Sequence, residues 1–107
     1  MKKYDVAVIG TGPGGYVAAV RASQRGASVV VIEKNDIGGV CLNVGCIPTK
    51  TLIYSAEMYR KMQHASEYGL KAESVGFDMA AMVARKNKVI GMNTGGIAAL
   101  FKGHGID

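Results

Sequence analysis

The first third of the chain alternates short apolar runs with glycine-rich and alanine-rich segments. The apolar run over residues 4–9 and the β-branched run over residues 28–32 are typical of buried parallel strands. Between them, residues 16–25 are rich in alanine, and Gly26 follows where the C-terminus of a helix is commonly capped. The pattern predicts a strand, a helix and a second strand, arranged as a βαβ unit.

The remainder of the chain predicts two longer helices separated by a loop. Residues 48–62 carry apolar side chains at helical spacing, and residues 65–76 are polar and loop-like. Asp78 is a suitable N-cap for a second helix over 79–102. Three glycines inside this helix weaken it by roughly 1 kcal/mol each relative to alanine, so we expect it to depend on packing. Residues 106–107 read as the start of another strand.

The turn after the first predicted strand carries the pattern G-x-G-x-x-G, as Gly10-Thr11-Gly12-Pro13-Gly14-Gly15. In a dinucleotide site the first glycine allows a tight turn, the second lets backbone approach a pyrophosphate, and the third lets the helix pack closely on the strand. Alone, the pattern could be a loop without ligand. Glu33, which ends the second strand 18 residues after the motif, supplies a carboxylate for ribose hydroxyls. This order predicts an adenine dinucleotide, either NAD or FAD.

The only two cysteines, Cys41 and Cys46, are separated by five positions. On an undistorted helix their Cα atoms would lie roughly 8 Å apart, beyond the ~7 Å limit for a disulfide. Gly45 permits an irregular backbone, so we expect a helix whose first turn is distorted by the bridge. Local sequence leaves three interpretations open: unrelated core cysteines, a metal site with distant histidines, or a redox dithiol with Lys50 as a nearby cation.

The run Gly38–Lys50, GGVCLNVGCIPTK, resembles the redox-active motif of the flavoprotein disulfide reductases, most closely that of the dihydrolipoyl dehydrogenases. The resemblance implies that Cys41 is the interchange thiol, which exchanges with substrate. It implies that Cys46 faces the flavin and makes the charge-transfer contact, with the lower thiol pKa, and that Lys50 lies beside the flavin ring. By this resemblance both cysteines are catalytic.

The resemblance also selects FAD as the dinucleotide, because in that family the segment corresponding to residues 33–41 runs along FAD. Val40 replaces the usual threonine and Thr49 the usual serine, and neither change removes a reacting group. The expected cofactor-binding residues are Gly10, Gly12, Pro13, Gly14, Gly15, Glu33, Lys34, Gly38, Gly39, Val40, Cys41 and Lys50. No metal site is expected.

The resemblance covers nearly the whole chain, but members of the family are several times longer. We therefore expect an α/β, Rossmann-like lobe comprising the N-terminal part of an FAD-binding domain over residues 1–107, without the family's NAD-binding and dimerisation domains. The complete homodimeric enzyme would oxidise dihydrolipoamide, carried on a lipoyl-carrier protein of a 2-oxo acid dehydrogenase or glycine cleavage system, and reduce NAD. Mercuric reductase, glutathione reductase and a nucleotide-binding fragment without turnover are the alternatives.

Composition excludes some classes of protein. With 49% hydrophobic and 20% charged residues among 107, the chain falls in the globular range rather than the disordered one. The net charge of +5 comes from scattered basic residues without interleaved aromatics, which argues against a nucleic-acid partner. We read no secretion signal and no membrane span, and so expect a cytoplasmic protein, where a cysteine pair is more often catalytic than structural.

Overall fold

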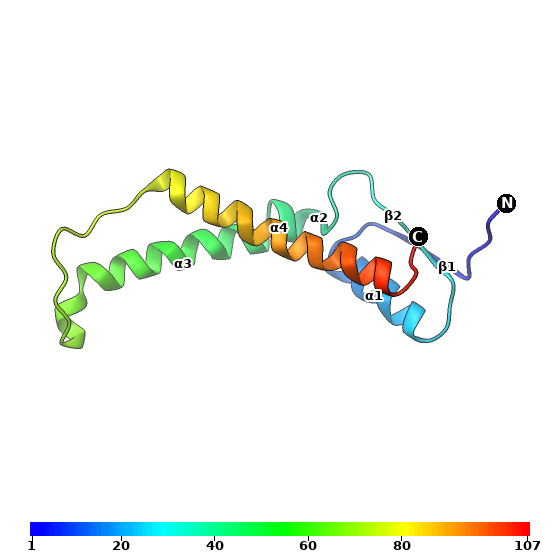
Figure 1. Ribbon diagram of the computed structural model, residues 1–107, viewed down its shortest axis with the longest axis horizontal. Helices are drawn as coiled ribbons and strands as arrows, with labels where there is room; N and C mark the ends of the chain where they lie inside the picture. The colour runs from blue at the N-terminus through cyan, green and yellow to red at the C-terminus, as the bar shows by residue number, and fades with distance from the viewer.

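The computed structural model describes all 107 residues and is strongly elongated. Its extents are 65 × 25 × 18 Å, with a radius of gyration of 19.4 Å. A compact chain of this length would have a radius of about 13 Å. A small α/β unit holding both chain ends lies at one end, and a helical hairpin extends from it (Figure 1). The elongation arises from the hairpin, which extends far beyond the α/β unit.

The α/β unit is built on two parallel strands, β1 (Val6–Ile9) and β2 (Val29–Ile32). Val6 pairs with Val29 and Ile9 with Ile32. Both strands were predicted to start slightly earlier. Just before the strands, the Asp5 carboxylate accepts hydrogen bonds from the Ser28 amide at 2.8 Å and from the Ser28 hydroxyl at 2.7 Å. These bonds hold the pKa of Asp5 below its usual range.

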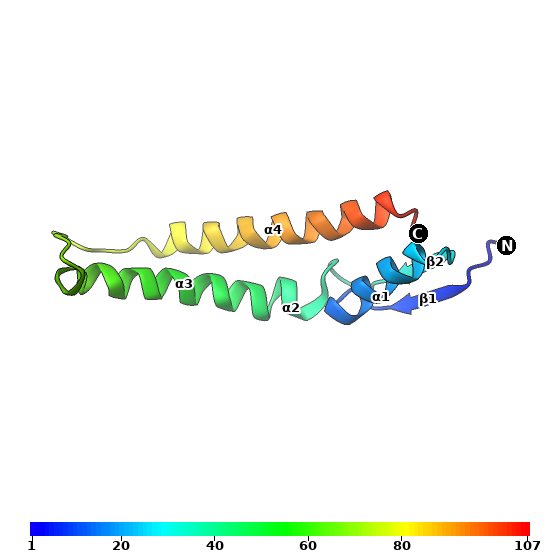
Figure 2. The ribbon, with the colours of Figure 1, turned by 90° about the horizontal axis from the view of Figure 1, so that it is seen from below.

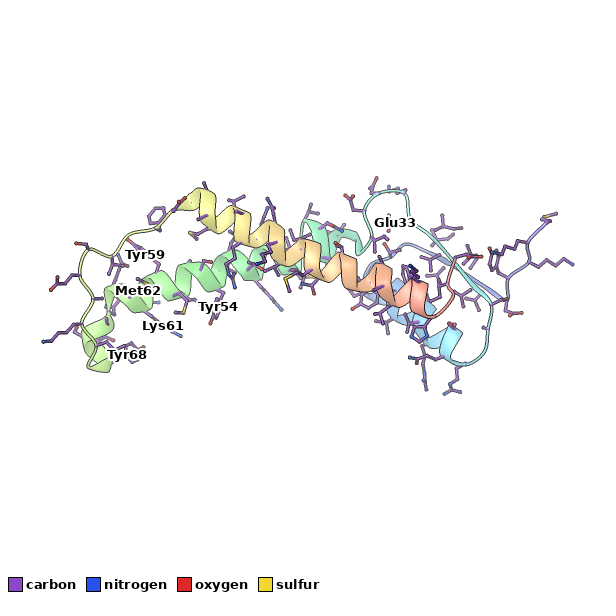
Figure 3. The ribbon with its side chains drawn as sticks, viewed as in Figure 1. Glu33, Tyr54, Tyr59, Lys61, Met62 and Tyr68 are labelled. Carbon is purple, nitrogen blue, oxygen red and sulfur yellow. A yellow bond between two sulfur atoms is a disulfide. The ribbon has the colours of Figure 1, made fainter.

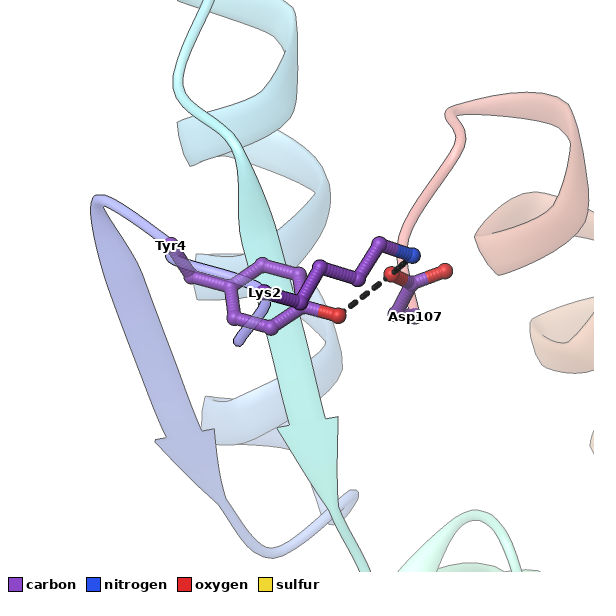
Figure 4. A network of polar contacts seen from close by, with 3 residues as sticks. All are labelled: Lys2, Tyr4 and Asp107. Carbon is purple, nitrogen blue, oxygen red and sulfur yellow. Dashed lines mark hydrogen bonds and ion pairs between the residues drawn. The ribbon is translucent and has the colours of Figure 1, made fainter.

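The sheet has two strands, and residues 106–107, where the start of another strand was predicted, make only backbone hydrogen bonds with β2. The Asp107 amide donates to the carbonyl of Val29 at 3.2 Å, and the Val31 amide donates to the carbonyl of Asp107 at 2.7 Å. The Asp107 carboxylate also pairs with Lys2 and accepts the Tyr4 hydroxyl at 2.5 Å (Figure 4). Residues 106–107 therefore lie along the edge of β2, and side-chain contacts join the two chain ends.

Helix α1 (Pro13–Gln24) connects the strands and begins three residues earlier than predicted. Proline fits at the first position of a helix, because the amide it lacks would have no partner there. At the other end Gly26 has φ +89° and the Ala27 amide donates to the Ala22 carbonyl at 3.2 Å, the Schellman cap predicted by the glycine. The core of the unit is small: Ala19, Val29 and Ile106 are buried together.

The hairpin consists of the short helix α2 (Gly39–Asn43), the long helix α3 (Cys46–Gln63), a 3₁₀ turn η1 (Ala65–Tyr68) and α4 (Met79–Gly103). Helix α4 runs back alongside α3 and returns the chain to the sheet (Figure 2). Asp78 caps α4 as predicted, accepting the Ala81 amide at 3.0 Å. The η1 turn was not predicted and lies in the expected loop.

Few residues of the whole chain are buried. Only 10 of 107 are, and the accessible surface is 7576 Å², against about 5,700 Å² for a compact protein of this mass. Tyr54 and Met62 project from α3 with about half of their surface exposed (Figure 3). In α4 only Ile97 is buried. The hairpin therefore presents apolar side chains that these 107 residues do not cover.

Candidate dinucleotide and dithiol site

The glycine loop joins the end of β1 to the start of α1. A Cβ on Gly15 would lie 2.9 Å from the carbonyl carbon of Gly10 and closer still to its oxygen, so only glycine allows α1 to approach the strand. Gly12 and Gly14 have no atom within 4 Å of the corresponding position. The loop thus leaves open space over the two positions that would face a pyrophosphate.

Glu33 follows β2 and points its carboxylate toward the glycine loop (Figure 3). Its Oε2 accepts hydrogen bonds from the Thr11 hydroxyl at 2.6 Å and the Thr11 amide at 2.9 Å, and its Oε1 accepts from the Asn35 amide at 3.0 Å. The Thr11 hydroxyl, followed by the Asn35 and Thr11 amides, lowers the pKa of Glu33 to about 2. The side chain is therefore ionised at neutral pH.

An ionised carboxylate offers about four lone-pair positions, and three are used here. About one remains for an incoming hydroxyl. A groove of about 540 Å³ lies beside Glu33 and is also lined by Lys34, Gly39 and Val40. Four of the residues expected to bind cofactor therefore share one hollow, and its volume is in the range of small-molecule sites. These features fit a ribose and pyrophosphate.

Cys41 and Cys46 form a disulfide, with their Cα atoms 4.6 Å apart. We expected one helix with a distorted first turn, but the structure has two helices separated at residues 44–45. Gly45 has φ −122° and ψ −111°, and a Cβ on it would lie 2.9 Å from the Val40 carbonyl oxygen. The complete break shortens the span from the helical value to one a disulfide can bridge.

The two sulfurs have different surroundings. Cys41 is half-buried within α2, whereas Cys46 is exposed and is the first residue of α3. A helix N-terminus favours an anionic sulfur, and Lys50 lies one turn further along the same helix, also exposed. In this chain Cys46 is thus the more accessible sulfur, the opposite of the order expected once a flavin covers it.

Helix α2 rests directly on the glycine loop. A Cβ on Gly39 would lie 2.9 Å from the Cα of Gly12, and the Gly38 amide donates to the Thr11 hydroxyl at 3.0 Å. We had expected Gly38 and Gly39 to let backbone lie against a cofactor. What they approach here is the protein itself: Gly39 meets the loop, and Gly38 meets the side chain of Leu42.

Two residues of the site were missed from the sequence. Thr11 occupies a variable position of the glycine motif, and a hydroxyl between glycines was the available signal. Asn43 donates through Nδ2 to the carbonyls of Ile37 at 3.0 Å and Gly39 at 2.9 Å, so it fastens the start of α2. Only the fold shows that these carbonyls lie within reach of Asn43.

Other parts of the molecule supply no competing site chemistry. The structure gathers no group of three or more His, Cys, Asp or Glu side chains that could hold a metal ion. His64 pairs with Glu67 at 3.2 Å on the surface, far along α3 from the disulfide. None of the helices combines the length and the apolar character needed to cross a membrane.

The site therefore combines a disulfide, a helix α2 that begins against the glycine loop, and an ionised acid hydrogen-bonded to that loop, and it can be compared with known proteins. The family model described as "Pyridine nucleotide-disulphide oxidoreductase" matches residues 4–106. The chain belongs to this family. Among curated members, the dihydrolipoyl dehydrogenase of Bacillus subtilis is 50% identical over 103 residues, and that of Acholeplasma laidlawii is 45% identical over 107.

A solved structure of a flavoprotein disulfide reductase is similar to the chain. The Cu(II) complex of the HOCl-induced flavoprotein disulfide reductase RclA from Escherichia coli superposes on the whole chain with a TM-score of 0.79 at 30% identity. Because the match covers the whole chain, it includes both the α/β unit and the helices that carry the disulfide. The chain covers 21% of that protein, and 22% and 32% of the two dehydrogenases, so it spans between a fifth and a third of these relatives.

Proposed function

We propose that these 107 residues are the N-terminal part of an FAD-binding domain and that the complete protein is a dihydrolipoyl dehydrogenase. The observation that carries the proposal is the Cys41–Cys46 disulfide, which begins in the helix α2 that rests on the glycine loop, with Glu33 and α2 lining one groove. The relatives named dihydrolipoyl dehydrogenase, at 45% and 50% identity, support this choice of substrate over the mercuric and glutathione reductases.

The dinucleotide would be held at two places. Amides at the start of α1, next to the open surface of Gly12 and Gly14, would bind the pyrophosphate, since a helix N-terminus favours anions. Glu33 would accept one ribose hydroxyl through its remaining lone-pair position. Pro13 fixes the first turn of α1, and Gly10 and Gly15 let the helix lie close enough to β1. Lys34, which follows β2, would face the cofactor together with Val40 of α2 and Lys50 of α3.

The disulfide would react by thiol exchange. A thiolate of dihydrolipoamide attacks the Cys41 sulfur, forms a mixed disulfide and releases Cys46 as a thiolate. The second thiol of dihydrolipoamide then attacks the substrate sulfur of the mixed disulfide and displaces Cys41 as a thiolate. This step releases lipoamide and leaves both cysteines reduced. Two electrons have passed from substrate to the cysteine pair. A bound FAD would supply the two-electron chemistry that links the reduced cysteine pair to NAD.

The partners of this reaction lie outside these residues. NAD and the second subunit of a homodimer would contact domains beyond the ones described. The lipoyl group would arrive on a carrier protein of a 2-oxo acid dehydrogenase complex or a glycine cleavage system, in the cytoplasm.

The proposal can be tested by substituting Glu33. Glu33→Ala in the complete protein should weaken FAD binding about tenfold, because a charged acceptor is lost. Glu33→Asp is the matched control, since it keeps the carboxylate and changes only the length of the side chain. Flavin retention after dialysis is the measurement. Retention by Glu33→Ala equal to that of the unsubstituted protein would contradict the ribose-binding role.

A second candidate function is FAD binding without turnover by the 107 residues alone. The observation that favours it is the exposed apolar surface: Ile9, Val40 and Val44 are 86%, 72% and 76% exposed near the site. Such a surface leaves the dithiol without walls that exclude water. An FAD titration of the chain, monitored by flavin fluorescence, measures binding, and an assay of NADH formation measures turnover.

A further inference from the structure

The hydroxyl of Thr11 joins three parts of the site. It donates to the Glu33 carboxylate at 2.6 Å and accepts the Gly38 amide at 3.0 Å. Thr11 is 1% exposed, and no buried side-chain polar atom in the structure lacks a hydrogen-bond partner. Because the hydroxyl has one proton, the direction of both bonds is fixed: the amide donates to the oxygen, and the oxygen donates to the carboxylate.

We propose that Thr11 is a positioning residue that couples the dinucleotide-binding acid to the redox helix. Through its hydroxyl and its amide it holds the Glu33 carboxylate in place beside the groove. Through the Gly38 amide it fixes the turn from which α2 and Cys41 begin. The inference rests on the proposed function only in taking Glu33 as the ribose acceptor.

Packing around Thr11 makes this coupling mechanical as well as electrostatic. Gly39 lies against Gly12, so the start of α2 cannot shift without moving the loop that includes Thr11. Cys41 follows Gly39 by two residues in the same short helix. The Gly38–Thr11 hydrogen bond is buried, and two successive hydrogen bonds ending on a carboxylate polarise each other, which strengthens both.

The coupling depends on the hydroxyl group of Thr11 rather than on the shape of its side chain. Valine has nearly the same shape as threonine but would leave the Gly38 amide buried and without a partner, and would remove the shortest of the hydrogen bonds to Glu33. Serine keeps the hydroxyl and loses only a methyl group. Thr11→Val and Thr11→Ser therefore separate hydrogen bonding from packing, and Thr11→Ala is a second hydroxyl-free variant in case valine prevents folding.

The test is made on the 107-residue chain by NMR. In the unsubstituted chain the Glu33 carboxyl should titrate at about 2, and in Thr11→Val this pKa should rise toward the ordinary value of 4.5. Hydrogen exchange of the Gly38 amide should accelerate about tenfold in Thr11→Val, as expected when a hydrogen-bonded amide opens more readily. Thr11→Ser should match the unsubstituted chain in both readings.

An FAD titration of the same variants gives the third reading. FAD affinity should fall about tenfold in Thr11→Val, equivalent to about 1.4 kcal/mol, and stay within about twofold in Thr11→Ser. An unchanged Glu33 pKa or unchanged Gly38 exchange in both hydroxyl-free variants would overturn the inference, as would unchanged FAD affinity. Failure of the unsubstituted chain to bind FAD would instead contradict the proposed function, and the two NMR readings would still decide the role of Thr11.

Discussion

Gly15 lies against Gly10, so that a Cβ on Gly15 would fall within 2.9 Å of the Gly10 carbonyl carbon. The contact sets how closely helix α1 approaches strand β1. It also explains why the third glycine of the motif cannot carry a side chain. The backbone of Gly10 cannot yield easily, because its amide donates to the Ile32 carbonyl at 2.7 Å and extends the β1–β2 ladder.

Gly15→Ala should therefore destabilise the chain by about 1–3 kcal/mol, the usual range for overpacking. Gly14→Ala is the matched control, because its Cβ would meet nothing within 4 Å and alanine favours a helix. Urea unfolding followed by circular dichroism measures both. Equal stability of the two variants would show that the Gly15 contact relaxes without penalty.

The reactivity of the two cysteines should reverse between the chain alone and the complete flavin-loaded enzyme. In the reduced chain, exposed Cys46 should alkylate before half-buried Cys41. In the complete enzyme the flavin should cover Cys46, so Cys41 should be labelled first. Mass spectrometry of peptides after brief iodoacetamide treatment distinguishes the two, and the chain unfolded in urea supplies the reference with both cysteines accessible.

The same assignment predicts a spectroscopic difference in the complete enzyme reduced by two electrons. Cys41→Ser should keep the long-wavelength absorbance of a thiolate beside flavin, because Cys46 supplies that thiolate at the start of α3. Cys46→Ser should lose it. Persistence of the band in Cys46→Ser would reverse the two roles.

The stability of the folded chain should decrease as the pH is lowered, because Glu33 becomes protonated. Its pKa is lowered from 4.5 to about 2 in the folded chain, so the stability it contributes is complete above about pH 4.5 and is lost as pH falls through 2. Asp5 and Asp107 also have lowered pKa values and act in the same direction. Glu33→Gln should therefore reduce the loss of melting temperature between pH 4.5 and pH 2 without abolishing it. A loss as large as in the unsubstituted chain would mean that Glu33 is not strongly hydrogen-bonded.

The chain alone should produce no NADH from dihydrolipoamide and NAD, even with FAD added. The described residues offer one dinucleotide groove, and the apolar side chains around the dithiol are exposed rather than enclosing it. Absorbance at the NADH maximum measures the outcome, with the Bacillus subtilis relative as positive control. NADH formation above the rate without chain would mean that these residues suffice for the whole reaction.

The sequence by itself predicted the strands and long helices in their order and proposed the residues of the site. Apolar runs and the cap signals of Gly26 and Asp78 located the strands and long helices to within a few residues, because these signals act over one or two turns of chain. The glycine motif, Glu33 and the cysteine pair were identified in the same way, since each depends on residue type and short spacing. Residues 106–107, predicted to start a strand, make backbone hydrogen bonds with β2 but do not form a strand of the sheet.

Tertiary structure alone decided how these pieces meet. The break between α2 and α3 depends on Gly45 packing against Val40, and the seat of α2 on the glycine loop depends on Gly39 meeting Gly12. Thr11 makes its hydrogen bonds because residues 11, 33 and 38 come together in the folded chain. The spacing of residues along the sequence does not reveal such a contact. Contacts between distant segments form only when the whole unit folds, so a pattern read over a few residues cannot determine them.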